Sequence, residues 1–291
     1  MKFSNRHNLP APLVRAIKND TYPVLTGNGL PVISVTSLLK PAQARALEKL
    51  HDAEIETDVS EHIYRLLGQS CHAVLEKAKG PGDISEKRYT TDFDGWTISG
   101  QVDLIEDDGT LSDLKVTSVY SFLLGEKIEW KQQISTYKWL AERNGVVIKK
   151  AQIVAILRDW QSSKAGPDEP DYPLAPSLTV PIETLSTTEV EALLRERLAL
   201  HVKAQVDPSS APCSPVERWE RPEKYAVMQK GKKRALRLLL SYKEAGEFIK
   251  NTGLQNLEID HRPAVNRRCE SFCMAAPWCE QRKALGVEIR G

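Results

Sequence analysis

Two strand-like runs joined by a turn sequence constrain the fold of this chain more than any other feature. The first run spans residues 97–105, the second spans residues 111–116, and Asp107-Asp108-Gly109 lies between them. A glycine at the third position of a three-residue loop suits a type I turn followed by a left-handed residue. That loop would place Glu106 opposite Thr110. The sequence therefore predicts a β-hairpin with a three-residue loop.

Acidic and basic side chains follow the two strands of this hairpin. Residues two apart in a strand share a face, so Asp113 and Lys115 project together. The three-residue loop pairs Asp103 with Asp113 and brings both acids to one face, away from Ile98, Val102 and Leu104. A two-residue loop would instead separate the two acids. The alternative interpretation is a hairpin whose polar residues only face solvent.

Two carboxylates and a lysine on one face are suited to metal-dependent hydrolysis of a phosphodiester bond. Carboxylate oxygens are the ligands that Mg²⁺ prefers. A bound Mg²⁺ or Mn²⁺ activates water and neutralises the charge that develops on the phosphate. A lysine beside it can stabilise the same charge. Asp103, Asp113 and Lys115 are therefore candidate catalytic residues.

Two helices expected on either side of the hairpin carry further candidates. His72 lies on an amphipathic helix expected over residues 61–79, and Gly68, one turn earlier, leaves open space over the imidazole for a metal. Gln133 and Tyr137 are four residues apart on a helix expected over residues 126–144, so they meet on one face. The alternatives are a structural histidine and an ordinary polar pair.

The order of elements indicates the fold class. Helix, hairpin, helix and strand follow one another, which predicts a mixed α/β protein rather than a doubly wound dinucleotide fold. No glycine-rich phosphate loop is present. The chain has 291 residues, of which 41% are hydrophobic and 27% are charged, as in ordinary globular proteins. No apolar run approaches the roughly 18 residues of a membrane span, and no signal peptide is visible, so we expect a cytoplasmic protein without membrane contact.

Four short motifs occur in a fixed order along about 70 residues and together resemble one family. They are Gly68-x-x-x-His72-x-x-Leu75-Glu76, Gly100-x-Val102-Asp103, Asp113-x-Lys115 and Gln133-x-x-x-Tyr137. This pattern resembles the RecB-like branch of the PD-(D/E)XK nucleases. The resemblance implies a restriction-endonuclease-like core, in which a mixed central sheet is flanked by helices. It implies a metal-dependent DNA exonuclease.

The same resemblance assigns roles to residues. It implies that His72, Asp103, Asp113 and Leu114 bind the metal, Mg²⁺ or Mn²⁺. It also implies that Lys115 supports catalysis. Gln133 and Tyr137 would line the site.

A cysteine group ends the chain. Cys269, Cys273 and Cys279 have the spacing C-x₃-C-x₅-C, which resembles the C-terminal group of iron–sulfur nucleases such as AddB and the CRISPR-associated RecB-like exonucleases. Those families use C-x₂-C-x₅-C, with a fourth cysteine before the nuclease motifs. Here the best fourth candidate is Cys213, and Cys71 is the alternative. Cys71 shares an apolar helix face and is predicted to lie in the core. The resemblance implies a structural [4Fe–4S] cluster in a C-terminal extension; Zn²⁺ and unligated thiols are the alternatives.

A basic segment precedes the cysteines. Residues 224–237 contain no acid, and the candidates for nucleic-acid binding are Lys230, Lys232, Lys233 and Arg234. The net charge of the whole chain is only +1, so any affinity for DNA must come from such a local patch. Trp219 and Tyr225 lie nearby and could stack on bases. The alternative is a solvated turn.

The expected organisation is an N-terminal helical or irregular segment (1–60), a nuclease core (61–205) and a C-terminal extension with the basic turn and cysteines (206–291). The expected substrate is single-stranded DNA or DNA ends, in recombination, replication or end processing, with a partner protein from those processes. The resemblance also fits a phage-encoded protein of the host cytoplasm. The rival functions are a double-strand-end exonuclease working with an annealing protein, a non-catalytic nucleic-acid-binding protein on a nuclease fold, and a zinc-stabilised structural protein.

Overall fold

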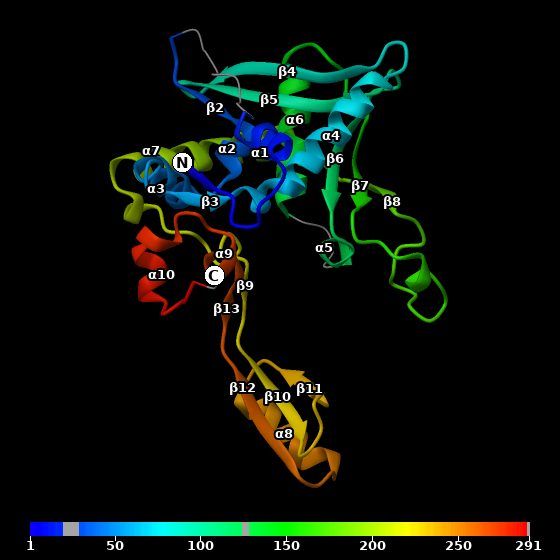
Figure 1. The fold of residues 1–291 in the computed structure, drawn as a ribbon, viewed down its shortest axis with the longest axis vertical. Helices are drawn as coiled ribbons and strands as arrows, with labels where there is room; N and C mark the ends of the chain where they lie inside the picture. Colours follow the sequence, from blue (N-terminus) through cyan, green and yellow to red (C-terminus); the bar gives the residue numbers. More distant parts are fainter. Residues whose placement is uncertain (20–28, 124–127, 290–291) are drawn as a thin grey trace. The chain divides into compact units, whose positions relative to one another are not determined.

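A computed structural model describes residues 1–19, 29–123 and 128–289 of the chain (Figure 1). The chain divides into two compact units. The first contains residues 1–40 and 52–202, and the second contains residues 41–51 and 203–291. The second unit is therefore built from two segments that lie far apart in the sequence.

A mixed sheet forms the centre of the first unit. Its strands are β2 (Val32–Ser34), β4 (Ile84–Phe93), β5 (Trp96–Ile105), β6 (Thr110–Thr117), β7 (Lys150–Leu157) and β8 (Ser177–Pro181). They follow the order β2-β5-β6-β7-β8, and β4 pairs with β5 in addition. The pairs β2–β5 and β6–β7 are parallel, whereas β4–β5, β5–β6 and β7–β8 are antiparallel.

Helices accompany this sheet. They are α1 (Ala11–Lys18), α2 (Val35–Leu39), α4 (Ile63–Lys77), α5 (Val119–Leu123), α6 (Ile128–Arg143) and α7 (Thr187–Val206); a small parallel pair, β1 (Lys2–Ser4) and β3 (Glu56–Asp58), lies near the N-terminus. The predicted mixed α/β fold, with a mixed central sheet flanked by helices, is confirmed. The predicted start of α6 at Glu126 lies outside the described residues.

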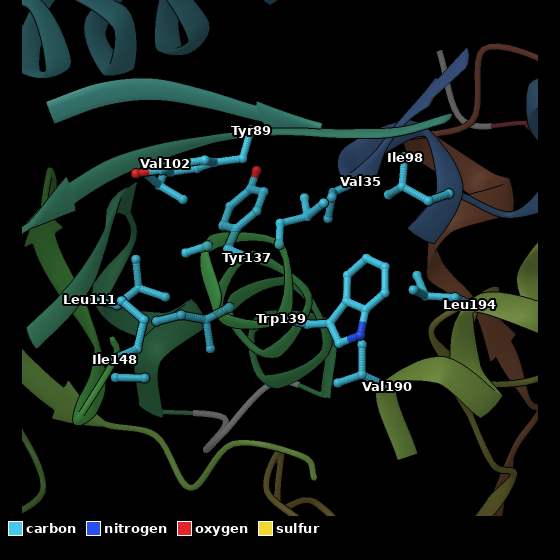
Figure 2. Close-up of a cluster of buried hydrophobic side chains, with 14 of the residues drawn as sticks. Val35, Tyr89, Ile98, Val102, Leu111, Tyr137, Trp139, Ile148, Val190 and Leu194 are labelled. Atoms are coloured by element: carbon cyan, nitrogen blue, oxygen red, sulfur yellow. The ribbon is translucent and has the colours of Figure 1, made fainter. Parts of the chain in front are cut away.

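Helix α6 connects the parallel strands β6 and β7 and supplies much of the core. Ile134 and Leu140 are fully buried, which stabilises the fold by roughly 1.5–3 kcal/mol for each side chain. Figure 2 shows Tyr137 and Trp139 of α6 among the buried side chains, with Val190 of α7 beside Trp139. The close packing of α6 on the sheet fixes the side chains that α6 directs toward β6.

Strand β4 is the main element that the sequence did not predict. It is ten residues long, and most of its residues are polar and at least partly exposed. Because such a strand lacks regular apolar alternation, its sequence gives no strand signal. The strand nevertheless pairs with β5 over nearly its whole length.

The apolar pattern of β5 also differs from the prediction. Ile98 and Val102 are buried as expected, but Leu104 is only partly buried, and Ile105 takes its place in the core. Val102 and Ile105 are three residues apart, whereas one face of a regular strand contains residues two apart. The strand therefore changes its facing between Val102 and Ile105, next to Asp103.

The second unit contains α3 (Ala42–Leu50) and the C-terminal elements. These are β9 (Glu220–Arg221), β10 (Lys224–Gln229), β11 (Arg237–Leu239), α8 (Tyr242–Thr252), β12 (Leu257–Arg262), β13 (Val265–Asn266), α9 (Arg267–Ser271) and α10 (Glu280–Ala284). A three-stranded sheet has the order β11-β10-β12, and β9 pairs with β13. Regular structure continues beyond Ile259, because β12 pairs with β10 and two short helices follow.

Candidate functional site

The hairpin between β5 and β6 has the predicted three-residue loop. Gly109 N donates to Glu106 O at 2.8 Å, and Glu106 N donates to Thr110 O at 2.9 Å. Gly109 has φ +86°, the left-handed conformation that the loop requires and that glycine adopts without steric cost. The prediction of this loop from Asp107-Asp108-Gly109 is confirmed.

The two strands separate just beyond the loop. Ladder pairing joins Leu104 with Ser112 and Ile105 with Leu111. At the next position, Leu114 N donates to the side chain of Asp103, with a distance of 2.7 Å to Oδ2. The carboxylate of Asp103 thus replaces the backbone of β5 as the partner of β6 and occupies the fork between the strands.

Asp113 lies close to Asp103 at this fork. Burial and the nearby charge of Asp113 raise the pKa of Asp103 to about 7. Asp113 is only 2% exposed, and its Oδ2 atom accepts no hydrogen bond. Lys115 Nζ lies 2.7 Å from that oxygen as an ion pair. The structure therefore brings the two predicted acids and the predicted lysine together.

Helix α6 completes this side of the site. Lys115 Nζ donates to Gln133 Oε1 at 3.0 Å, and Gln133 Nε2 donates to the hydroxyl of Tyr137 at 3.0 Å. Burial and the charge of Asp113 raise the pKa of Tyr137 far above its usual range, so its hydroxyl stays protonated. The predicted pair on α6 forms one hydrogen-bonded chain with Lys115.

Helix α4 brings His72 to the same place. His72 Nδ1 lies 3.0 Å from Glu86 Oε1 and 3.6 Å from Asp103 Oδ1. The hydrogen bond to Glu86, together with the charge of Asp103, raises the pKa of His72, although burial opposes the shift. A Cβ atom added at Gly68 would have no neighbour within 4 Å, so open space is present at this glycine.

Glu86 is the site residue that the sequence did not predict. It lies on β4, directly opposite Asp103, because Ser85 pairs with Leu104 and Lys87 pairs with Val102. The trio His72, Glu86 and Asp103 has ligand atoms that all lie within 4.8 Å of one another. Nothing in the local sequence points to this contact, since β4 itself lacks a strand pattern.

A cleft of ≈310 Å³ opens on these groups. Acidic residues dominate its charged lining, and the lining residues include His72, Leu114, Glu76, Asp83, Glu86, Asp103 and Glu106, with Lys79 as a basic residue. An imidazole and several carboxylates form a set of donors that suits a hard divalent cation. Leu114 could contribute only its backbone carbonyl oxygen, because its side chain is aliphatic. The residues present therefore fit a divalent metal ion.

Four of the five cysteines line one cavity in the second unit. Cys213, Cys269, Cys273 and Cys279 all contribute to it. Burial raises the pKa of Cys213 to about 12 and the pKa of Cys273 to about 11. Among the described residues, no three of these sulfur atoms lie within 4.8 Å of one another.

Cys71 is the remaining cysteine, and its predicted place in the core is wrong. It lies on α4 in the first unit and is only partly buried. Helix α4 has no fully buried residue, and Val74 on the predicted apolar face is 65% exposed. The amphipathic pattern therefore predicted the helix correctly but overstated its burial.

The basic candidates lie on the turn between β10 and β11. The side chains of Lys230, Lys232, Lys233 and Arg234 are all exposed. The two neighbouring aromatic rings already have protein partners. Tyr225 stacks on His261 with a centroid distance of 4.9 Å, and the guanidinium of Arg268 lies 4.3 Å from the ring centroid of Trp219.

No family model and no curated protein match this sequence. Two solved structures are distantly similar in fold. One is described as the crystal structure of SSO0001; the identity is 21% and the TM-score is 0.46, and the match covers 65% of this chain and 83% of the other. The second is an alkaline exonuclease, LHK-Exo, from Laribacter hongkongensis; the identity is 10% and the TM-score is 0.37, and the match covers 58% of this chain and 87% of the other. Neither similarity is close enough to assign a function.

Within residues 1–19, 29–123 and 128–289, no helix is both long enough and apolar enough to cross a bilayer.

Proposed function

We propose that this chain is a metal-dependent DNA exonuclease that hydrolyses phosphodiester bonds at the fork between β5 and β6. The observation that supports this most is the convergence of Asp103, Asp113 and Lys115 at one fork, with His72 beside them. Scattered polar residues on a solvated hairpin would not be buried against one another in this way. The order of the four motifs supports the same chemistry.

The protein groups divide into two sets with different tasks. His72, Asp103, Asp113 and the Leu114 carbonyl are the proposed metal ligands. A cation bound there would act as a Lewis acid on the phosphate and would lower the pKa of water. An acidic cleft repels a phosphate in the absence of such a cation.

The second set acts on the phosphate itself. Lys115 would stabilise the negative charge that develops during cleavage. Gln133 accepts a hydrogen bond from Lys115 and donates one to Tyr137, so it restricts the ammonium group to one position. Positioning of this kind lowers the entropic part of the barrier.

The first experiment measures cleavage of end-labelled single-stranded and double-stranded DNA with Mg²⁺, Mn²⁺ or EDTA. Asp113→Asn should abolish cleavage, whereas Asp94→Asn should not, because Asp94 lies exposed at the turn between β4 and β5. We expect metal-dependent removal of nucleotides from ends of single strands. Degradation of duplex ends alone would favour the double-strand-end exonuclease. The absence of cleavage by folded wild-type protein would overturn the proposal.

We further propose that Cys213, Cys269, Cys273 and Cys279 hold a [4Fe–4S] cluster. All four cysteines line one cavity, and this shared cavity supports a common metal centre. Four thiolates would also bind a single Zn²⁺ ion tetrahedrally. The cluster would be structural, because hydrolysis needs no electron transfer.

Metal analysis of anaerobically purified protein tests the cluster. We expect iron and acid-labile sulfide in equal amounts, and a lower melting temperature for Cys273→Ser. Cys71→Ser is the matched control, since this cysteine belongs to the first unit, and it should retain the iron. Zinc without iron would support the alternative ligand, and protein that contains neither metal would refute a metal site.

The exposed basic turn is the proposed contact for the DNA backbone. Lys230, Lys232, Lys233 and Arg234 project from it. Lysine and arginine contacts with phosphates release counterions and give affinity without sequence preference. Because Tyr225 and Trp219 contact protein groups, the turn would bind through charge rather than through base stacking.

A further inference from the structure

The pairing of β4 with β5 is interrupted where Glu86 faces Asp103. Pairing is regular on both sides, at Ser85–Leu104 and at Lys87–Val102. Glu86 itself has φ +49°, a conformation that residues other than glycine rarely adopt. Backbone strain of this type is unfavourable, so other interactions must hold it in place.

The distorted backbone directs the carboxylate of Glu86 toward the fork. Its Oε1 atom lies 3.0 Å from His72 Nδ1, which is also 3.6 Å from Asp103 Oδ1. Neighbouring ligands of an octahedral Mg²⁺ ion, each about 2.1 Å from the metal, lie roughly 3.0 Å apart. The first of these distances matches that spacing, the second, at 3.6 Å, is longer, and all three ligand atoms lie within 4.8 Å of one another.

Each carboxylate uses one oxygen for support and leaves the other for a ligand. Gln101 Nε2 donates to Glu86 Oε2 at 2.5 Å, and Arg88 Nη2 holds the same Gln101 side chain through its Oε1 at 2.7 Å. Leu114 N donates to Oδ2 of Asp103. Oε1 of Glu86 and Oδ1 of Asp103 are the two oxygens that remain, and both lie beside the imidazole.

We propose that Glu86 is a direct ligand of the divalent cation, together with His72 and Asp103. This inference rests on the proposed function, because it concerns the metal of that same site. It adds a carboxylate that lies outside the four sequence motifs. Asp113 keeps its proposed place among the ligands and also forms an ion pair with Lys115, so Glu86 would add a third carboxylate to the set.

Isothermal titration of Mn²⁺ into the full chain, without DNA, tests the ligand. Glu86→Gln keeps the shape of the side chain and one oxygen atom, but it loses the negative charge. We expect at least roughly tenfold weaker binding of Mn²⁺. Asp94→Asn is the matched control, since it removes a carboxylate from a residue of the same hairpin with φ +51°.

The outcomes separate the two proposals. Unchanged Mn²⁺ affinity in folded Glu86→Gln, beside a wild-type protein that binds Mn²⁺ and cleaves DNA, would overturn the role of Glu86 alone. Wild-type protein that binds no Mn²⁺ would instead overturn the proposed function. If Glu86→Gln does not fold, Glu86→Asp replaces it. That variant keeps the charge but shortens the side chain, so unchanged affinity would also count against direct ligation.

Discussion

Gly100 of β5 lies against α6 so closely that a single methyl group should disturb the packing. A Cβ atom added there would lie 2.7 Å from Cδ1 of Leu140 and 3.0 Å from two ring carbons of Tyr137. Contacts below 3.0 Å between carbon atoms require one side to move. Gly100→Ala therefore tests whether the motif needs glycine at this position for steric reasons.

The size of the effect follows from the burial of the two neighbours. Leu140 is fully buried and Tyr137 is 5% exposed, so neither can move into solvent. Inserting a methylene-sized group into such a core costs about 1–3 kcal/mol. Without a clash, alanine would stabilise a strand over glycine by roughly 0.5–1 kcal/mol. The steric clash is larger, so we expect Gly100→Ala to lower the free energy of unfolding. A loss of this size lowers the melting temperature by about 2–12 °C in a unit of this length.

Thermal unfolding followed by circular dichroism measures this change. Gly246→Ala is the control, because a Cβ atom there meets nothing within 4 Å and the residue lies inside helix α8. The control should keep or raise the melting temperature. An unchanged or higher melting temperature for Gly100→Ala would refute the steric argument. A loss of cleavage by the folded variant would follow from displacement of Tyr137.

Three further predictions follow from other parts of the chain. Gly68→Ala should raise helix stability by about 0.5–1 kcal/mol but reduce cleavage, because the methyl group enters the open space one helical turn before His72, where DNA or metal would bind. Full activity would contradict this. Hydrogen bonds from Arg6 N and Ser60 lower the pKa of Asp58 in the folded protein. The Asp58 carboxylate therefore stabilises the fold above the pKa of an unfolded aspartate, about 4, and this stabilisation is lost as the pH falls further. Asp58→Asn should therefore lower the melting temperature at pH 7, with a difference that shrinks below pH about 4, and a constant difference would count against it. Replacing Lys232 and Lys233 with alanine should reduce the salt dependence of single-strand binding by about 1.4 in log–log slope, and an unaltered slope would make the basic turn a solvated loop.

The hairpin could be predicted from sequence because it is local. Its loop needs a left-handed residue at one position, and Gly109 meets that need within a few residues of both strands. The hydrogen bonds that link Lys115, Gln133 and Tyr137 were also partly predictable. The strand places Asp113 and Lys115 on one face, and the helix places Gln133 and Tyr137 on one face.

Glu86 could not be predicted in the same way. Its contact with His72 depends on the register of β4 against β5 and on a local backbone distortion, neither of which has a sequence pattern. The switch in β5 from a buried Val102 to a buried Ile105 could not be predicted either. Ile105 is buried in place of Leu104 because the ladder is interrupted, and regular alternation cannot foresee an interruption.

The second unit is built from two segments that are far apart in the sequence, and this affects how it can fold. Leu47 of α3 packs with Ala275 and Cys279, which follow it by more than two hundred residues in the chain. His51 likewise stacks on Trp278 with a centroid distance of 4.5 Å. Because a ribosome makes α3 before residues 275–279, Leu47 lacks these packing partners until they have been synthesised. A chain cut after residue 202 would lack these partners of α3, so the first unit cannot be separated cleanly by a single cut at that boundary.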